Sequence, residues 1–242
     1  MKIKQAVIFA GGRGKRLKPL TNNLPKPLVN VDGSPFLDYL IFELERNGIE
    51  KILILVGYKS KKIISRYQNY KNVKIHFSYS NYSTNTAKRI LNAKNMLDEK
   101  FLLLYGDNFL KFSLERINKL FINKKAQISN IVFNNKNCLG EYGCKNNIKY
   151  NKKRRVVYYD KSMTSKENNA LDIGFFIIKK KYISKFKNLN SSFESYILKK
   201  VIDEKKMYCF VTSKQYYYIT NINSLKMFEK YVKKSSLNKI KI

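Results

Sequence analysis

The feature that most constrains this chain is the junction between an apolar run and a glycine-rich segment near its start. Residues 5–10, QAVIFA, lead directly into residues 11–16, GGRGKR. The apolar run predicts a buried strand, and glycines after a strand let backbone N–H groups approach phosphate. The spacing is not that of a Walker A motif, and Leu17 stands where the dinucleotide-binding fingerprint has its third glycine. A short glycine loop of this kind also fits an ordinary tight turn.

A lysine between two prolines, Pro25-Lys26-Pro27, follows the glycine loop. Flanking prolines restrict the backbone and so fix the direction in which the lysine points. The loop itself also carries a guanidinium, that of Arg16. A glycine loop, a guanidinium and a fixed lysine together suit a triphosphate whose leaving group must be neutralised.

Length and composition predict one domain over residues 1–232 and a Lys-rich tail over 233–242 that is a candidate for disorder. No apolar run approaches the roughly 20 residues of a membrane span. Because the N-terminus goes directly into a predicted strand, we expect no signal peptide. The three cysteines, Cys138, Cys144 and Cys209, lack metal-ligand spacing and are expected to be reduced. These features predict a cytoplasmic protein.

The chain is strongly basic, with 49 Lys and Arg against 17 Asp and Glu and a formal net charge of +32. Only eight of the basic residues are Arg, and the lysines are spread along the whole chain. Nucleic-acid interfaces usually exploit Arg for bidentate contacts. The pattern therefore favours the codon bias of an AT-rich genome over a specific nucleic-acid partner, and nucleic-acid binding remains an alternative motivated by charge alone.

Apolar runs and helical spacings alternate along the chain, which predicts an α/β fold: a Rossmann-like, doubly wound, mostly parallel mixed sheet flanked by helices. The expected strands are residues 5–10, 52–56, 73–79, 101–105, 126–134, 171–178, 208–211 and 216–219, with a hairpin within 148–160. The expected helices are residues 36–44, 61–67, 84–97, 193–202 and 224–232, with Ser224 as the cap of the last one.

The whole opening string, GGRGKRLKPLTNNLPKPLVNVDGSPFLDYLI, resembles the start of the sugar-1-phosphate nucleotidyltransferases, also called nucleotide-sugar pyrophosphorylases. The resemblance is dense over residues 5–40 and patchier to about residue 230, and it is strongest to the heptose- and mannose-1-phosphate guanylyltransferase group. It implies a GT-A-like fold and a Mg²⁺-dependent reaction. In that reaction a sugar 1-phosphate and a nucleoside triphosphate give an NDP-sugar and pyrophosphate for surface-polysaccharide precursors.

The resemblance also implies site residues. The implied catalytic residues are Arg16, which clamps the phosphates, Lys26, which contacts the phosphates of the nucleotide, and Asp107, which follows a predicted strand and binds Mg²⁺. The implied nucleotide-binding residues are Ala10, Gly11, Gly12, Gly14, Lys15, Thr84 and Gly106. The implied sugar-phosphate-binding residues are Gly143, Asp160, Lys161, Asp172 and Gly174.

Three departures from the family pattern bear on activity. Residues 82–87 read YSTNTA where relatives carry Leu-Gly-Thr-Gly-Gly-Ala, and Asp160 is one methylene shorter than the usual Glu. Tyr218 stands at the position of the second metal-ligating Asp, and a neutral phenol is a poor Mg²⁺ ligand. Three explanations stay open: Asp107 holds the metal with phosphates and water, activity is weakened, or the alignment is shifted and Asn221 serves.

The base, the sugar and the oligomeric state are not determined by the sequence, and a homo-oligomer is left open. Two alternative functions follow from the same resemblance. One is a choline-phosphate cytidylyltransferase of the same superfamily. The other is a catalytically impaired relative that binds a nucleotide sugar for regulation, motivated by Tyr218 and by the missing glycines.

Overall fold

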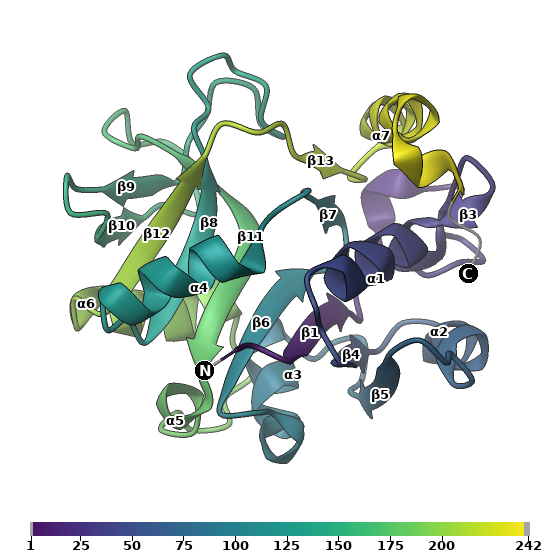
Figure 1. The fold of residues 1–242 in the computed structure, drawn as a ribbon, viewed down its shortest axis with the longest axis horizontal. Coiled ribbons are helices and arrows are strands. Elements are labelled where there is room, and N and C mark those ends of the chain that lie inside the picture. The colour runs from purple at the N-terminus through teal and green to yellow at the C-terminus, as the bar shows by residue number, and fades with distance from the viewer. Residues whose placement is uncertain (1, 240–242) are drawn as a thin grey trace.

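The strands of the central sheet are β1 (Gln5–Ala10), β4 (Lys51–Val56), β5 (Lys74–Tyr79), β6 (Lys100–Tyr105), β8 (Ile128–Phe133), β11 (Leu171–Lys179) and β12 (Met207–Thr212). The computed structural model describes residues 2–239, and within them these seven strands form one sheet in the order β12-β8-β11-β6-β1-β4-β5 (Figure 1). Only β11 runs against its neighbours β6 and β8. The fold class predicted from the sequence is confirmed.

Both faces of the sheet are covered because its central strands are apolar on both sides. In β1, Ala6 and Ile8 belong to one buried cluster, and Val7 and Phe9 belong to the other. The first cluster includes side chains of the helices α1 (Phe36–Arg46), α2 (Ser60–Tyr67), α4 (Leu114–Asn123) and α7 (Ile222–Lys234). The second includes side chains of α3 (Thr86–Asn92), α5 (Lys180–Ile183), the π-helix η4 (Phe193–Leu198) and α6 (Lys199–Asp203).

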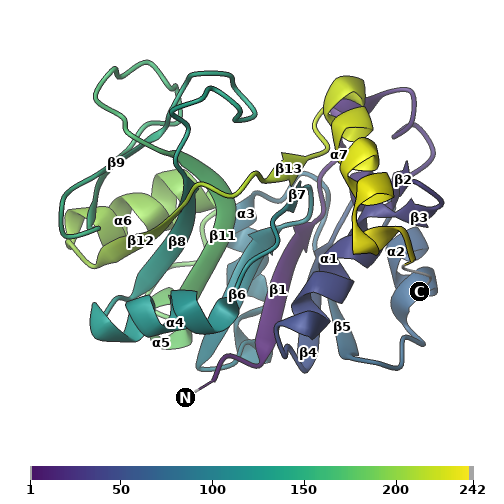
Figure 2. The same cartoon turned by 45° about the horizontal axis from the view of Figure 1, so that its top comes forward.

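The parallel register brings the carboxyl ends of the central strands to one edge. Ala10 at the end of β1 is paired with Val56 at the end of β4, and Phe9 is paired with Tyr105 at the end of β6. Figure 2 shows this edge at the top, close to the short antiparallel pair β7 (Asn108–Phe109) and β13 (Tyr217–Tyr218). In open α/β sheets the loops at this edge are the ones that bind ligands.

The second half of the chain is less regular, as its sequence pattern indicated. The predicted hairpin is present as β9 (Ile148–Tyr150) paired with β10 (Val156–Tyr159). The helix expected over 193–202 is present, but it begins as η4 and continues as α6. The helix α4 was not predicted from the sequence. Ser113 caps it, and Leu114, Ile117 and Phe121 are buried on its inner face.

The last helix begins earlier than predicted. Asn221 is the N-cap of α7, and its side chain accepts a hydrogen bond from the Ser224 amide in a capping box. Ser224 was therefore the wrong cap, because it occupies the third helical position and bonds back to the cap. In the expected tail, α7 continues to Lys234, a 3₁₀ turn covers Ser236–Lys239, and Leu237 is buried. Residues 240–242 lie outside the described part of the chain.

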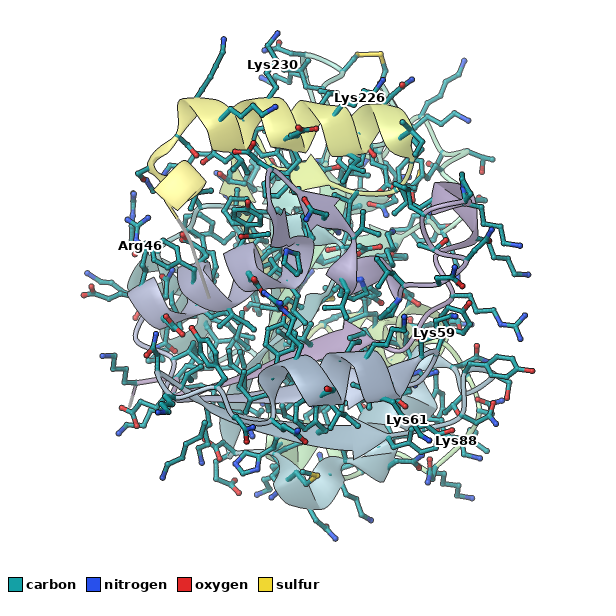
Figure 3. All side chains as sticks on the ribbon, turned by 90° about the vertical axis from the view of Figure 1, so that its right-hand side faces the viewer. Arg46, Lys59, Lys61, Lys88, Lys226 and Lys230 are labelled. Carbon is teal, nitrogen blue, oxygen red and sulfur yellow. A yellow bond between two sulfur atoms is a disulfide. The ribbon has the colours of Figure 1, made fainter. Side chains whose placement is uncertain are left out.

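The basic side chains are distributed over many elements of the surface. On one face they extend from helices and loops that are far apart in the sequence (Figure 3). The labelled examples are Arg46, Lys59, Lys61, Lys88, Lys226 and Lys230. Within residues 2–239 no helix has the length and apolarity required to cross a lipid bilayer.

Candidate active site

Two adjoining cavities open at the carboxyl edge of the sheet. The first, the glycine-loop cavity, has a volume of about 510 Å³ and is lined by residues around Gly11, Tyr82 and Gly106. The second, the hairpin cavity, has a volume of about 530 Å³ and lies beside β9, β10 and β11. Five residues line both cavities: Arg16, Tyr105, Asp107, Lys161 and Glu194. A ligand in each cavity would meet the other at these shared side chains.

The glycine loop forms one wall of the first cavity. Gly14 has a φ of +61°, and a Cβ there would lie 2.9 Å from the Cβ of Lys26, so a side chain is excluded for two reasons. At the rim, the Arg13 guanidinium lies 3.9 Å from the centre of the Tyr82 ring, within cation–π range. All residues predicted to bind the nucleotide line this cavity: Ala10, Gly11, Gly12, Gly14, Lys15, Thr84 and Gly106.

Lys26 of the Pro25-Lys26-Pro27 segment forms an ion pair with Asp107. Lys26 opens a 3₁₀ turn, Lys26–Leu28, that begins after the extended Pro25. Its Nζ lies 2.6 Å from Oδ2 of Asp107, which follows β6. The Lys26 side chain is 13% exposed and the Asp107 side chain 31% exposed, so the carboxylate is the more open of the two to a ligand.

Arg16 lies at the border of the two cavities with 64% of its side chain exposed. Its Nη1 is 3.6 Å from Oε1 of Glu141, which also accepts a 2.7 Å hydrogen bond from the Thr220 hydroxyl. An ion pair this exposed contributes about 0–1 kcal/mol. The guanidinium is therefore free to exchange this partner for a phosphate, which its planar fork binds at two oxygens.

Three of the residues predicted to bind the sugar phosphate line the hairpin cavity: Lys161, Asp172 and Gly174. Burial raises the pKa of Asp172 to about 7, although hydrogen bonds from the Asn130 amide and the Gly174 N–H oppose the shift. Gly174 has a φ of +76°, and a Cβ there would lie 2.7 Å from the Tyr105 ring, so this position requires glycine.

The structure does not bring Asp160 into either cavity. Its two carboxylate oxygens accept hydrogen bonds from the amides of Ser162, Thr164 and Ser165 and from the Asn168 side chain. The side-chain hydrogen bond from Ser162, followed by these backbone bonds, lowers the pKa of Asp160 to about 2. The shorter acid thus organises its own loop, and its oxygens are already occupied there.

Gly143 does not line the cavities either; its neighbour Tyr142 does. The Gly143 carbonyl accepts a 2.7 Å hydrogen bond from the Asn135 amide group, and its φ of +62° marks a turn. Residues 142 and 143 therefore contribute the Tyr142 ring to the hairpin cavity, while Gly143 shapes the loop that carries this ring.

Glu194 is a candidate site residue that was not predicted from the sequence. It lies on η4 and lines both cavities, and its carboxylate accepts a short hydrogen bond from the Tyr105 hydroxyl. The sequence offers one signal: an acid directly after the apolar Phe193, at the start of the amphipathic helix predicted over 193–202. Because Glu194 is far from the other site residues along the chain, the sequence alone does not place it near them.

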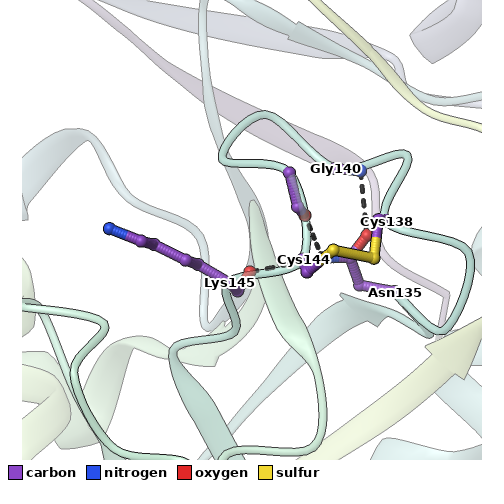
Figure 4. The surroundings of a disulfide bond; sticks show 6 residues. Asn135, Cys138, Gly140, Cys144 and Lys145 are labelled. Atoms are coloured by element: carbon purple, nitrogen blue, oxygen red, sulfur yellow. Dashed lines mark hydrogen bonds between the residues drawn. A yellow bond between two sulfur atoms is a disulfide. The ribbon is translucent and has the colours of Figure 1, made fainter.

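A disulfide between Cys138 and Cys144 closes the loop next to the hairpin cavity (Figure 4). The prediction that all three cysteines are reduced was therefore wrong for this pair, and Cys209 is the buried free thiol. The error arose because spacing along the chain does not show which thiols meet in space. The Asn135 side chain holds the same loop by bonds to Gly140 and to the carbonyls of Gly143 and Lys145.

Two carboxylates, those of Asp107 and Glu194, line both cavities, and the Glu194 carboxylate accepts a hydrogen bond from the Tyr105 hydroxyl. Tyr218 is paired with Asn108 in the β13–β7 ladder, so the segment that carries it does lie beside Asp107. Asn221 is engaged as the cap of α7 and is not free to serve as a ligand. Across residues 2–239 no group of three His, Cys, Asp or Glu side chains is gathered that could hold an ion. The donor set fits a metal held by one carboxylate together with ligand oxygens and water.

A model of the family described as nucleotidyl transferase matches residues 5–234. The chain is 39% identical over 111 residues to the UTP–glucose-1-phosphate uridylyltransferase AglF of Haloferax volcanii, a match that covers 46% of each chain. It is 27% identical over 212 residues to the D-glycero-alpha-D-manno-heptose 1-phosphate guanylyltransferase of Aneurinibacillus thermoaerophilus, covering 86% of this chain and 89% of that protein. The chain spans about half or less of the length of several curated relatives that it matches.

Solved structures show the same fold. The crystal structure of HddC from Yersinia pseudotuberculosis superposes with a TM-score of 0.77 at 24% identity, covering 95% of this chain and 99% of that one. A second structure of that protein, in complex with GMP-PN, gives a TM-score of 0.76.

Proposed function

Because this chain belongs to the nucleotidyl transferase family, we propose that it joins a nucleoside triphosphate to a sugar 1-phosphate and releases pyrophosphate. The observation that carries this proposal is the pair of cavities that share Arg16, Asp107 and Lys161 at their border. Two phosphorylated substrates need two adjacent pockets with cationic groups at the point where their phosphates meet. The relatives named uridylyltransferase and guanylyltransferase support the same reaction class.

In the proposed reaction, an oxygen of the sugar 1-phosphate attacks the α-phosphorus of the triphosphate. A new P–O bond forms, the bond between the α-phosphorus and the bridging oxygen breaks, and pyrophosphate leaves with the electron pair. Catalysis of such a transfer rests on positioning and on stabilising the charge that develops on the phosphate oxygens.

The side chains divide this work by position. Arg16 binds the departing phosphates with its fork, and Lys26 neutralises charge in the glycine-loop cavity. Lys161, which lines both cavities, holds the attacking sugar phosphate. Asp107 would hold Mg²⁺, which supplies Lewis-acid stabilisation of phosphate oxygens when bound.

We assign recognition of the sugar to Glu194 and Asp172 in place of Asp160. Both carboxylates line the hairpin cavity, where acceptor oxygens can take hydrogen bonds from sugar hydroxyls. The phenol of Tyr105 donates to Glu194 and so fixes its orientation. This pocket offers hydrogen-bond acceptors to a polyhydroxylated substrate. Its carboxylates and the rings of Tyr142 and Tyr159 are also groups that bind a quaternary ammonium, so phosphocholine is the runner-up substrate that the assay includes.

We place the enzyme in the cytoplasm, where nucleoside triphosphates are available, and in the synthesis of surface-polysaccharide precursors. The cytoplasmic prediction no longer draws support from three reduced cysteines, since two of them are paired. A relative that acts on a heptose 1-phosphate supports the precursor role. Mass spectrometry of reactions with each triphosphate and a panel of sugar 1-phosphates plus phosphocholine tests the proposal. The expected product is an NDP-sugar, and a CDP-choline product would replace it with the cytidylyltransferase alternative.

A further inference from the structure

Arg89 is a buried arginine directly beneath the glycine loop. It lies on α3, is 4% exposed and lines the glycine-loop cavity. Burial lowers the pKa of its guanidinium, and among the described residues no carboxylate forms an ion pair with it. A buried charge without a counter-charge is costly unless its hydrogen bonds are complete.

The hydrogen bonds of Arg89 are complete. A guanidinium with its Nε has five N–H groups, and here each has a backbone carbonyl as acceptor. The acceptors are the carbonyl oxygens of Thr84 (2.9 Å), Val56 (3.0 Å), Ser80 (3.2 Å), Gly11 (3.4 Å) and Asn81 (2.8 Å). They belong to the segments that leave β1, β4 and β5 and to the turn before α3. One side chain therefore ties together the segments that form one wall of the cavity.

Two glycines make room for this guanidinium. A Cβ at Gly11 would lie 2.2 Å from Nη1 of Arg89, and a Cβ at Gly57 would lie 2.7 Å from the same atom. Neither glycine has a positive φ, so backbone conformation does not demand them. Position 11 therefore needs a glycine because a side chain there would collide with the Arg89 guanidinium, whichever ligand binds the loop.

The contact with Gly11 also determines the direction of the next amide. The Gly11 carbonyl accepts from Arg89 and from the Tyr58 amide at 3.1 Å, so it points into the protein. Because a trans peptide is planar, the N–H of Gly12 points the opposite way. A Cβ at Gly12 would meet nothing within 4 Å, and among residues 2–239 the Gly12 amide has no acceptor.

We propose that Arg89 is a positioning residue for nucleotide binding: it holds the Gly11–Gly12 peptide so that the Gly12 amide faces the nucleotide. This inference rests on the proposed function, because it takes the ligand of the glycine-loop cavity to be a nucleoside triphosphate. A lysine cannot replace Arg89, since one ammonium has three donors and no planar fork to reach acceptors on four segments.

Titration calorimetry with GTP, CTP, UTP, dTTP and ATP, each with Mg²⁺, tests this role. Arg89→Lys and Arg89→Ala are expected to raise the Kd of the most tightly bound triphosphate about tenfold or more. Added guanidinium at non-denaturing millimolar concentration should partly restore binding to Arg89→Ala, and methylammonium should not. Arg66→Ala is the matched control, because Arg66 pairs with buried Asp38 outside the cavities. It should lower the melting temperature without changing the triphosphate Kd.

A double-mutant cycle supplies a second readout that general destabilisation does not mimic. Gly11→Ala alone should weaken triphosphate binding because the new Cβ displaces the Arg89 guanidinium. In the Arg89→Ala background the same change should have a much smaller effect, because the space is empty. Full additivity, or wild-type affinity in both Arg89 variants, would overturn the positioning role. Absence of triphosphate binding by the wild-type chain would instead contradict the proposed function itself.

Discussion

The Nζ of Lys26 lies 2.6 Å from Oδ2 of Asp107, although the two residues are 81 positions apart in the sequence. The pair joins the proline-bracketed segment to the end of β6 at the border of two cavities. A ligand phosphate and its metal ion would each find an opposite charge there. The pair therefore marks the point at which we expect the triphosphate to react.

Arg16→Lys tests the phosphate clamp. The variant keeps the charge but loses the fork, so turnover should fall roughly a hundredfold, the scale seen when one transition-state charge donor is removed. The KM values should change less. Steady-state kinetics measure both, with Arg46→Lys on the surface of α1 as the control. Unchanged turnover in Arg16→Lys would place Arg16 outside the reaction.

Tyr218→Asp tests the metal environment. The change adds a carboxylate beside Asn108, next to Asp107, so half-maximal activity should need less Mg²⁺. Asp107→Ala should abolish metal-dependent turnover and weaken Mn²⁺ binding to the nucleotide complex, measured by electron paramagnetic resonance. Tyr218→Phe is the control and should behave as wild type. A Mg²⁺ requirement that is the same in Tyr218→Asp and wild type would show that position 218 does not face the metal.

Glu194→Gln and Asp160→Asn separate sugar recognition from loop stability. Glu194→Gln should raise the KM for the sugar phosphate about tenfold, the cost of one charged hydrogen bond, and change the triphosphate KM less. Asp160→Asn should lower the melting temperature above pH 4, because the depressed pKa of Asp160 means its stabilisation is present there and is lost as pH falls toward 2. The assignment fails if Asp160→Asn, and not Glu194→Gln, raises the sugar-phosphate KM.

Asp172 should give the protein a pH-dependent stability. Its pKa is raised by burial to about 7, so the folded state holds a proton that the unfolded state releases near pH 4. Its contribution to stability is complete below pH 4 and is lost as pH rises from 4 through 7. Asp172→Asn removes this loss, so its melting temperature relative to wild type should be higher at pH 8 than at pH 5. An equal difference at both pH values would contradict the raised pKa.

The sequence was sufficient for the parts of the fold in which one element carries its own signal. β1, β4 and β6 are apolar on both faces, which is the pattern of a buried parallel strand. The helix α4 was not predicted, although half of its ten residues are apolar and Leu114, Ile117 and Phe121 follow helical spacing. The start of η4 as a π-helix has no signal in the sequence that distinguishes it from an α-helix.

The same distinction holds for the site. Residues in contiguous motifs, such as Gly12, Lys26 and Asp107, were predicted and line one cavity. Glu194 was missed because its partner Tyr105 is 89 positions away, and Arg89 was missed because its bonds to Val56 and Gly11 join it to distant segments. Asp160 lies outside both cavities because the amides of Thr164 and Ser165 bind its carboxylate, and this local arrangement is visible only in the three-dimensional loop.

The most direct test of the central claim is pyrophosphate release across a matrix of five nucleoside triphosphates and a panel of sugar 1-phosphates. The proposed function predicts Mg²⁺-dependent release with at least one pair, stoichiometric with NDP-sugar and absent in Asp107→Ala. If no pair gives pyrophosphate above a no-enzyme control while the wild-type chain still binds a nucleotide sugar by calorimetry, the chain is a nucleotide-sugar-binding protein and not a transferase.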